Sequence, residues 1–143
     1  MKILKILLAD DDHDDRYFFE KSLNEIPIAT ELTIVNDGEM LMKYLSNKTN
    51  NLPDVLFLDL NMPRKNGFEC ICEIKEDERL QNMHVIMFST SFPQDPDYEE
   101  GMINTLMNIG ATHLIRKAAN IEDLKKSIHE ALLEIIAIME LGK

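Results

Sequence analysis

The chain has 143 residues, of which 45% are apolar and 29% charged, a balance that suits one domain with a buried core. Its net charge of -11 disfavours binding to nucleic acid or to an anionic membrane, because both attract basic surfaces. The N-terminal apolar run is too short for a signal peptide, and no run approaches the ~18 residues of a membrane span. We expect a soluble, cytoplasmic protein with a single domain over residues 1–143.

Short apolar runs alternate along the chain with segments of helical spacing. In chain order, the sequence predicts strands at 3–9, 32–35, 55–58, 85–88 and 113–116, and helices at 14–25, 38–46, 67–77, 98–109 and 121–141. This alternation predicts an α/β fold, a parallel sheet covered by helices on both faces. Segment 91–100 holds two prolines and four acids and is predicted to be an extended, mobile loop.

Polar side chains follow the carboxyl ends of four predicted strands, the edge of a parallel sheet where ligands gather. Clustered carboxylates repel one another unless a cation lies between them, and Mg²⁺ prefers such hard oxygen ligands. A carboxylate nucleophile beside Mg²⁺, with an ammonium and a hydroxyl for the oxyanions, is what phosphoryl transfer requires. The first strand is followed by Asp10, Asp11 and Asp12, and the third by Asp59. The fourth ends in Ser89 and Thr90, and the fifth in Arg116 and Lys117.

Four short segments resemble the motifs of the receiver domain of two-component response regulators. They are "LLADDD", "LDLNMP", "MFSTS" and "LIRK", and the likeness covers essentially the whole chain. The resemblance implies a doubly wound, flavodoxin-like sheet of five strands in the order 2-1-3-4-5.

Carried over by position, the resemblance also implies a role for each site residue. Asp59 would be the phospho-acceptor, Ser89 the hydroxyl that follows the phosphoryl group, and Lys117 its counter-ion. The Mg²⁺ ligands would be Asp11, Asp59 and the backbone carbonyl of Asn61, with Asp10 as the second pocket acid and Asp12 as an extra acid. The implied partners are a histidine kinase or phosphotransfer protein and a downstream protein, so the chain would be a signalling protein rather than an enzyme.

Three features of the sequence, two single residues and one loop, depart from the family pattern. Ala118 stands where the family usually has proline, and a cis bond before alanine would cost ~3 kcal/mol, so the sequence leaves open whether the Lys117–Ala118 bond is cis or trans. Leu114 occupies the usual aromatic position of the last strand, and the loop at 91–101 is longer than usual.

Two other functions fit parts of this pattern. A phosphatase of the haloacid dehalogenase type also uses an aspartate at a strand end with Mg²⁺, but it needs a second acid where this chain has Asn61. A degenerate receiver would bind partners without phosphorylation, and Ala118 is the departure that favours it. Taken alone, Asp10 to Asp12 would be read as a helix N-cap.

The last predicted helix carries a second apolar stripe. Leu133, Ala137 and Leu141 recur at i, i+4 and i+8, outside the arc expected to pack against the sheet. The stripe predicts contact with a second copy of the chain or with a partner helix. Isolated apolar residues near a fraying terminus would give the same pattern.

Overall fold

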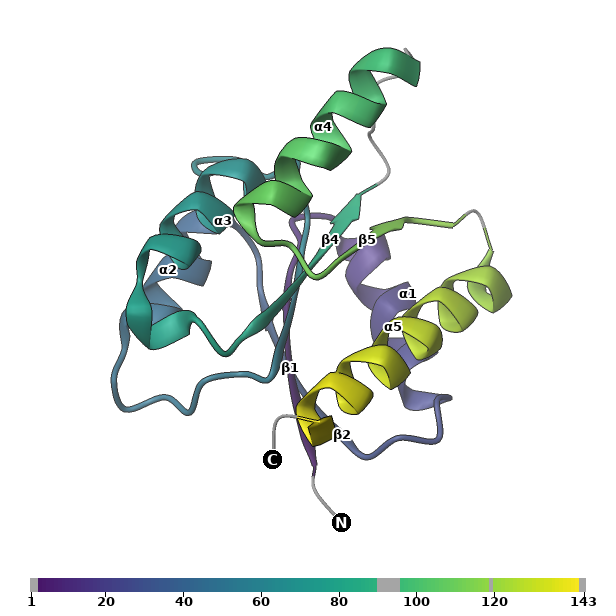
Figure 1. Ribbon diagram of the computed structural model, residues 1–143. Helices are drawn as coiled ribbons and strands as arrows, with labels where there is room; N and C mark the ends of the chain where they lie inside the picture. Colours follow the sequence, from purple (N-terminus) through teal and green to yellow (C-terminus); the bar gives the residue numbers. More distant parts are fainter. Residues whose placement is uncertain (1–2, 90–95, 119, 142–143) are drawn as a thin grey trace.

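The computed structural model describes residues 3–89, 96–118 and 120–141, in which strands and helices alternate (Figure 1). The elements are β1 (Leu4–Ala9), α1 (His13–Asn24), β2 (Thr30–Val35), α2 (Gly38–Ser46), β3 (Val55–Leu58), α3 (Gly67–Glu76), the 3-10 helix η1 (Glu78–Leu80), β4 (His84–Ser89), α4 (Pro96–Ile109), β5 (His113–Arg116) and α5 (Ile121–Leu141). Within these ranges, no helix combines the length and apolar character needed to cross a bilayer.

The five strands form one parallel sheet in the order β2-β1-β3-β4-β5, which confirms the predicted fold class. Ala9 at the end of β1 pairs with Val35 on one side and with Leu58 on the other. Ser89 at the end of β4 pairs with Arg116 of β5. The carboxyl ends of the strands therefore lie at one edge of the sheet, where the candidate site residues follow them.

Two apolar cores lie on opposite faces of the sheet, because successive side chains of a strand point to opposite faces. In β3, Val55 and Phe57 belong to the core under α1 and α5, whereas Leu56 and Leu58 belong to the core under α2, α3 and α4. Figure 1 shows this division of the helices. In the first core, the Phe57 ring lies edge-on to Phe19 of α1, with ring centroids 4.8 Å apart.

The start of α4 differs from the sequence prediction. The sequence predicts a helix from residue 98 and an extended loop over 91–100, which overlap, whereas the observed helix already begins at Pro96. Proline favours the first helical position because its φ is already helical and no hydrogen bond is lost there. The loop prediction is wrong for residues 96–100, and residues 91–95 lie outside the described part of the chain.

The final helix is buried on one face as predicted. Leu124, Ile128 and Leu132 pack under the sheet, whereas the Leu133 side chain is 50% exposed and Leu141 is 87% exposed. Ala137 is also exposed. The second apolar stripe of α5 therefore faces outward in this single chain.

Candidate functional site

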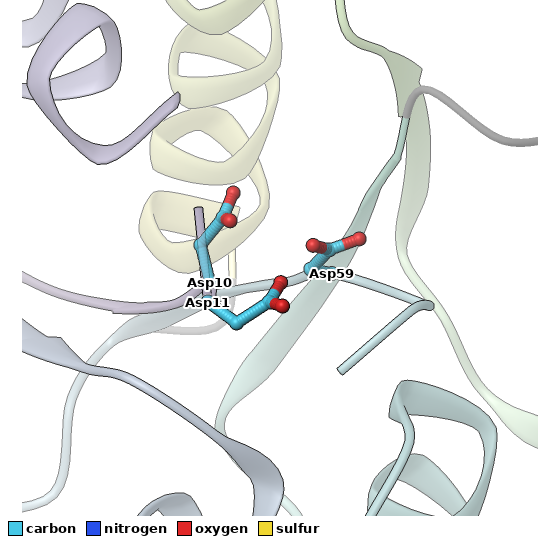
Figure 2. Close-up of side chains that lie close together, drawn as sticks. All are labelled: Asp10, Asp11 and Asp59. Carbon is cyan, nitrogen blue, oxygen red and sulfur yellow. The ribbon is translucent and has the colours of Figure 1, made fainter. Parts of the chain in front are cut away.

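Three carboxylates meet at the carboxyl edge of the sheet. Asp10 follows β1, Asp59 follows β3, and the Asp59 amide donates to the Ala9 carbonyl at 3.0 Å, which joins the two strand ends. One oxygen each of Asp10, Asp11 and Asp59 lies within 4.8 Å of the others (Figure 2). Asp10 and Asp59 are buried and Asp11 is exposed. The strand ends thus bring together all three acids that the sequence assigned to the pocket.

Asp12 has a different role from its neighbours. Its side chain caps α1 by accepting a hydrogen bond from the Asp15 amide at 3.1 Å. Its own amide donates to Asp10 Oδ1 at 2.9 Å. The N-cap interpretation is therefore right for Asp12, and this residue explains why a third acid follows the pocket pair.

Lys117 reaches the carboxylates from the end of β5. Its Nζ lies 2.6 Å from Asp10 Oδ2, 2.9 Å from Asp15 Oδ2 and 3.4 Å from Asp59 Oδ2. The side chain is only 6% exposed, and the ammonium lies 5.2 Å from the centre of the Phe88 ring. The bond to Ala118, whose isomer the sequence left open, is trans, because the described residues contain no cis peptide.

The sequence prediction missed Asp15. This residue is the third of α1 and presents its carboxylate to Lys117 from outside the strand ends. A signal was available, because an acid at the third position of a helix that starts directly after β1 lies near the carboxyl edge of the sheet. The structure therefore places three carboxylates around the Lys117 ammonium, those of Asp10, Asp15 and Asp59.

Burial controls the ionisation of these groups. Burial, together with the nearby charge of Asp10, raises the pKa of Asp59 to about 6 against the attraction of Lys117. Burial also raises the pKa of Asp10 above its usual value, against its hydrogen bond to Lys117. Burial disfavours the Lys117 ammonium, but contacts with Asp10 and Asp15 raise the pKa of Lys117 above its ordinary value. The Lys117 side chain therefore stays positively charged.

Ser89 and Asn61 lie beside this cluster. Ser89 is fully buried at the end of β4, and its carbonyl accepts a hydrogen bond from the Lys117 amide at 3.0 Å. The Asn61 amide donates to Asp59 Oδ1 at 3.2 Å. Ser89 is thus hydrogen-bonded to Lys117, and Asn61 to Asp59. Thr90 lies outside the described residues.

The loop after Asp59 is held by close backbone contacts. The Gly67 amide donates to the Leu60 carbonyl at 2.9 Å, and a Cβ at Gly67 would stand 2.2 Å from the Asp59 carbonyl oxygen. A Cβ at Gly38, the first residue of α2, would stand 2.0 Å from the Lys65 carbonyl oxygen. Only glycine permits such approaches of one backbone to another.

Comparison with known proteins gives consistent matches. Residues 6–129 match the family model described as the response regulator receiver domain. The response regulator Rcp1 of Synechocystis sp. is 28% identical, and the alignment covers 86% of this chain and 82% of that protein.

Two solved structures share the fold over most of both chains. The Mn²⁺-bound form of response regulator Rcp1 superposes with a TM-score of 0.77 at 27% identity, covering 89% of this chain and 90% of that one. The phosphorylated cyanobacterial phytochrome response regulator RcpA gives 0.75 at 29% identity, covering 91% of each chain. The sequence match and the five-stranded topology agree, and the chain belongs to the response regulator receiver domain family.

Proposed function

We propose that Asp59 accepts a phosphoryl group from a histidine kinase, a phosphotransfer protein or a small acyl phosphate. The observation that carries the proposal is the convergence of Asp10, Asp11 and Lys117 on Asp59 at the sheet edge. With a pKa of about 6, most Asp59 is ionised at neutral pH and can act as a nucleophile.

The transfer needs little from the protein beyond position and charge. A carboxylate oxygen of Asp59 forms a bond to phosphorus while the bond from phosphorus to the donor's leaving group breaks. The Lys117 ammonium, 3.4 Å from Asp59 Oδ2, neutralises oxygens of the arriving phosphoryl group. The chain thus acts as a phospho-acceptor whose only chemistry is its own phosphorylation and dephosphorylation.

The acidic cluster suits a divalent cation of the Mg²⁺ type. Three carboxylates supply oxygen ligands, and Asp10 Oδ2 has no hydrogen-bond donor in the described residues besides the nearby Lys117 ammonium. Asp11, Asp59 and the Asn61 carbonyl would hold the ion, with Asp10 beside them. When bound, Mg²⁺ would neutralise charge on the phosphoryl oxygens. The Mn²⁺-bound form of the relative Rcp1 supports this assignment.

Incubation with acetyl phosphate and Mg²⁺, followed by intact-mass measurement, tests the proposal. Wild-type protein should gain one phosphoryl group, and both chelation of Mg²⁺ and Asp59→Asn should abolish the gain. Asp14→Asn is the matched control, because Asp14 carries the same charge nearby but is 85% exposed. If Asp59→Asn labels as well as wild type, the acceptor assignment is wrong. Continuous turnover of a phosphate ester would favour the phosphatase alternative, and neither labelling nor turnover would favour the degenerate receiver.

Phosphorylation is proposed to alter the surface formed by α4 and β5. Ser89 and Lys117 end adjacent strands and are joined by a backbone hydrogen bond, so movement of either toward the phosphoryl group affects both strands. Hydrogen exchange should change at α4 and β5 when Asp59 is phosphorylated. A change confined to other elements would contradict this proposal.

Partner binding is proposed to be by protein contact. The net charge of -11 argues against nucleic acid and anionic membranes as partners and is compatible with a cytoplasmic location. The outward-facing Leu133, Ala137 and Leu141 of α5 support contact with a second copy or with a partner helix.

A further inference from the structure

The Lys117 ammonium has one acidic partner that the proposed transfer does not use. Asp15 Oδ2 lies 2.9 Å from Lys117 Nζ and accepts a hydrogen bond from it, whereas Asp59 Oδ2 lies 3.4 Å away. Asp15 belongs to α1, whereas Asp59 follows β3. In this state Lys117 is therefore bound more closely to Asp15 than to the phospho-acceptor.

The three contacts of the ammonium differ in what their loss would cost. Asp10 and Asp59 are buried, so either carboxylate would lose its counter-charge without gaining water. The Asp15 side chain is 31% exposed, so its carboxylate stays hydrated when the ammonium leaves. The contact with Asp15 is thus the one that Lys117 can exchange for a new anion most cheaply.

A cavity lies beside Lys117 on the side of α1 and the start of α5. Its volume is about 120 Å³, and Lys117 lines it together with Asp15, Phe18, Phe88 and Ala118, among others. Ala118 has only a methyl group at this wall. On this side, therefore, Lys117 is not enclosed by close packing.

We propose that Asp15 is a positioning residue that holds the Lys117 ammonium toward α1 and competes for it with a phosphoryl group on Asp59. The inference rests on the proposed function of Asp59. Asp15 would weaken the interaction between the Lys117 ammonium and the phosphoryl group on Asp59. When Asp59 is unmodified, Asp15 would keep the ammonium in place.

Affinity for beryllofluoride, a stable mimic of the phosphoryl group, measures this competition at saturating Mg²⁺. Asp15→Asn should tighten beryllofluoride binding by about fivefold at low ionic strength, and by less at high salt, because the ion pair is partly exposed. Asp14→Asn removes the same charge one residue earlier without touching Lys117 and should change the affinity by less than about twofold.

A double-mutant cycle separates action through Lys117 from a general charge effect. In a Lys117→Gln background, Asp15→Asn should change beryllofluoride affinity no more than Asp14→Asn does. An Asp15→Asn effect that persists in this background, or one that Asp14→Asn reproduces in wild type, would overturn the proposal.

The lysine itself provides a readout that does not depend on phosphorylation. In unmodified protein, Asp15→Asn should shift the Lys117 side-chain resonances in ¹³C and ¹⁵N correlation spectra, and Asp14→Asn should leave them in place. Absence of beryllofluoride binding to wild type would refute the function of Asp59. Unchanged Lys117 resonances in Asp15→Asn would refute the role of Asp15.

Discussion

Replacement of the acceptor carboxylate by its neutral amide, Asp59→Asn, should stabilise the metal-free protein at neutral and alkaline pH. Burial raises the pKa of Asp59 from an ordinary 3.8 to about 6, a difference of about 2 units. Each unit corresponds to 1.36 kcal/mol, so ionised Asp59 costs the folded state up to about 3 kcal/mol at pH 8. Asparagine removes that cost and can still accept the hydrogen bond from the Asn61 amide.

The sign of the pH dependence follows from proton linkage. Between pH 3.8 and about 6, the folded state holds the Asp59 proton and the unfolded state has released it. The contribution of Asp59 to stability is therefore fully present below the unfolded pKa and is lost as pH rises through the folded value. The advantage of Asp59→Asn should be largest at pH 8 and should disappear near pH 4.

Urea unfolding in the presence of a chelator, at pH 8 and at pH 4, measures both quantities. At pH 8 we expect the free energy of unfolding of Asp59→Asn to exceed that of wild type by about 2–3 kcal/mol, or roughly 5–10 °C in Tm. Asp14→Asn, at an exposed position, should match wild type within about 0.5 kcal/mol. Added Mg²⁺ should stabilise wild type more than Asp59→Asn. Equal stability of Asp59→Asn and wild type at pH 8 would refute the reasoning.

Two further substitutions test the acceptor loop and the outer stripe of α5. Gly67→Ala forces a Cβ against the Asp59 carbonyl and should destabilise the fold by about 1–3 kcal/mol in urea unfolding, whereas Gly101→Ala, which meets nothing within 4 Å, should be neutral or stabilising. Equal effects of the two glycine substitutions would contradict the packing argument. Leu133→Glu combined with Leu141→Glu should weaken association in sedimentation velocity without changing phosphoryl labelling, and an unchanged sedimentation profile would remove the docking proposal.

The main features of the fold could be predicted from local patterns. The apolar runs match all five observed strands to within two residues, since strands buried on both faces need continuous apolar sequence. The beginning of α4 could not be predicted the same way. Pro96 and the acids after it are typical of a loop, yet the same residues are also favoured in the first turn of a helix.

The candidate site was predictable where its residues end strands and less so elsewhere. Asp10, Asp59 and Lys117 meet because parallel strands present their carboxyl ends at one edge. Asp15 lies on a helix, and its approach to Lys117 depends on how α1 packs against the sheet, which strand order alone does not determine. The positive φ of 70° at Arg64 was equally hidden, because glycine or asparagine would normally indicate that conformation.

The contacts of Gly38 and Gly67 have a consequence for the direction in which a signal can travel. Both glycines join the loop after Asp59 to the starts of α2 and α3 through backbone atoms, which cannot change rotamer as side chains do. This side of the acceptor therefore acts as a stationary support. Added charge on Asp59 is expected to displace the opposite side, where Lys117 is held by exchangeable ion pairs. Because one side of the site is rigid and the other is not, the structural change that follows phosphorylation should spread away from α2. It should move toward the end of the sheet that carries β4 and β5.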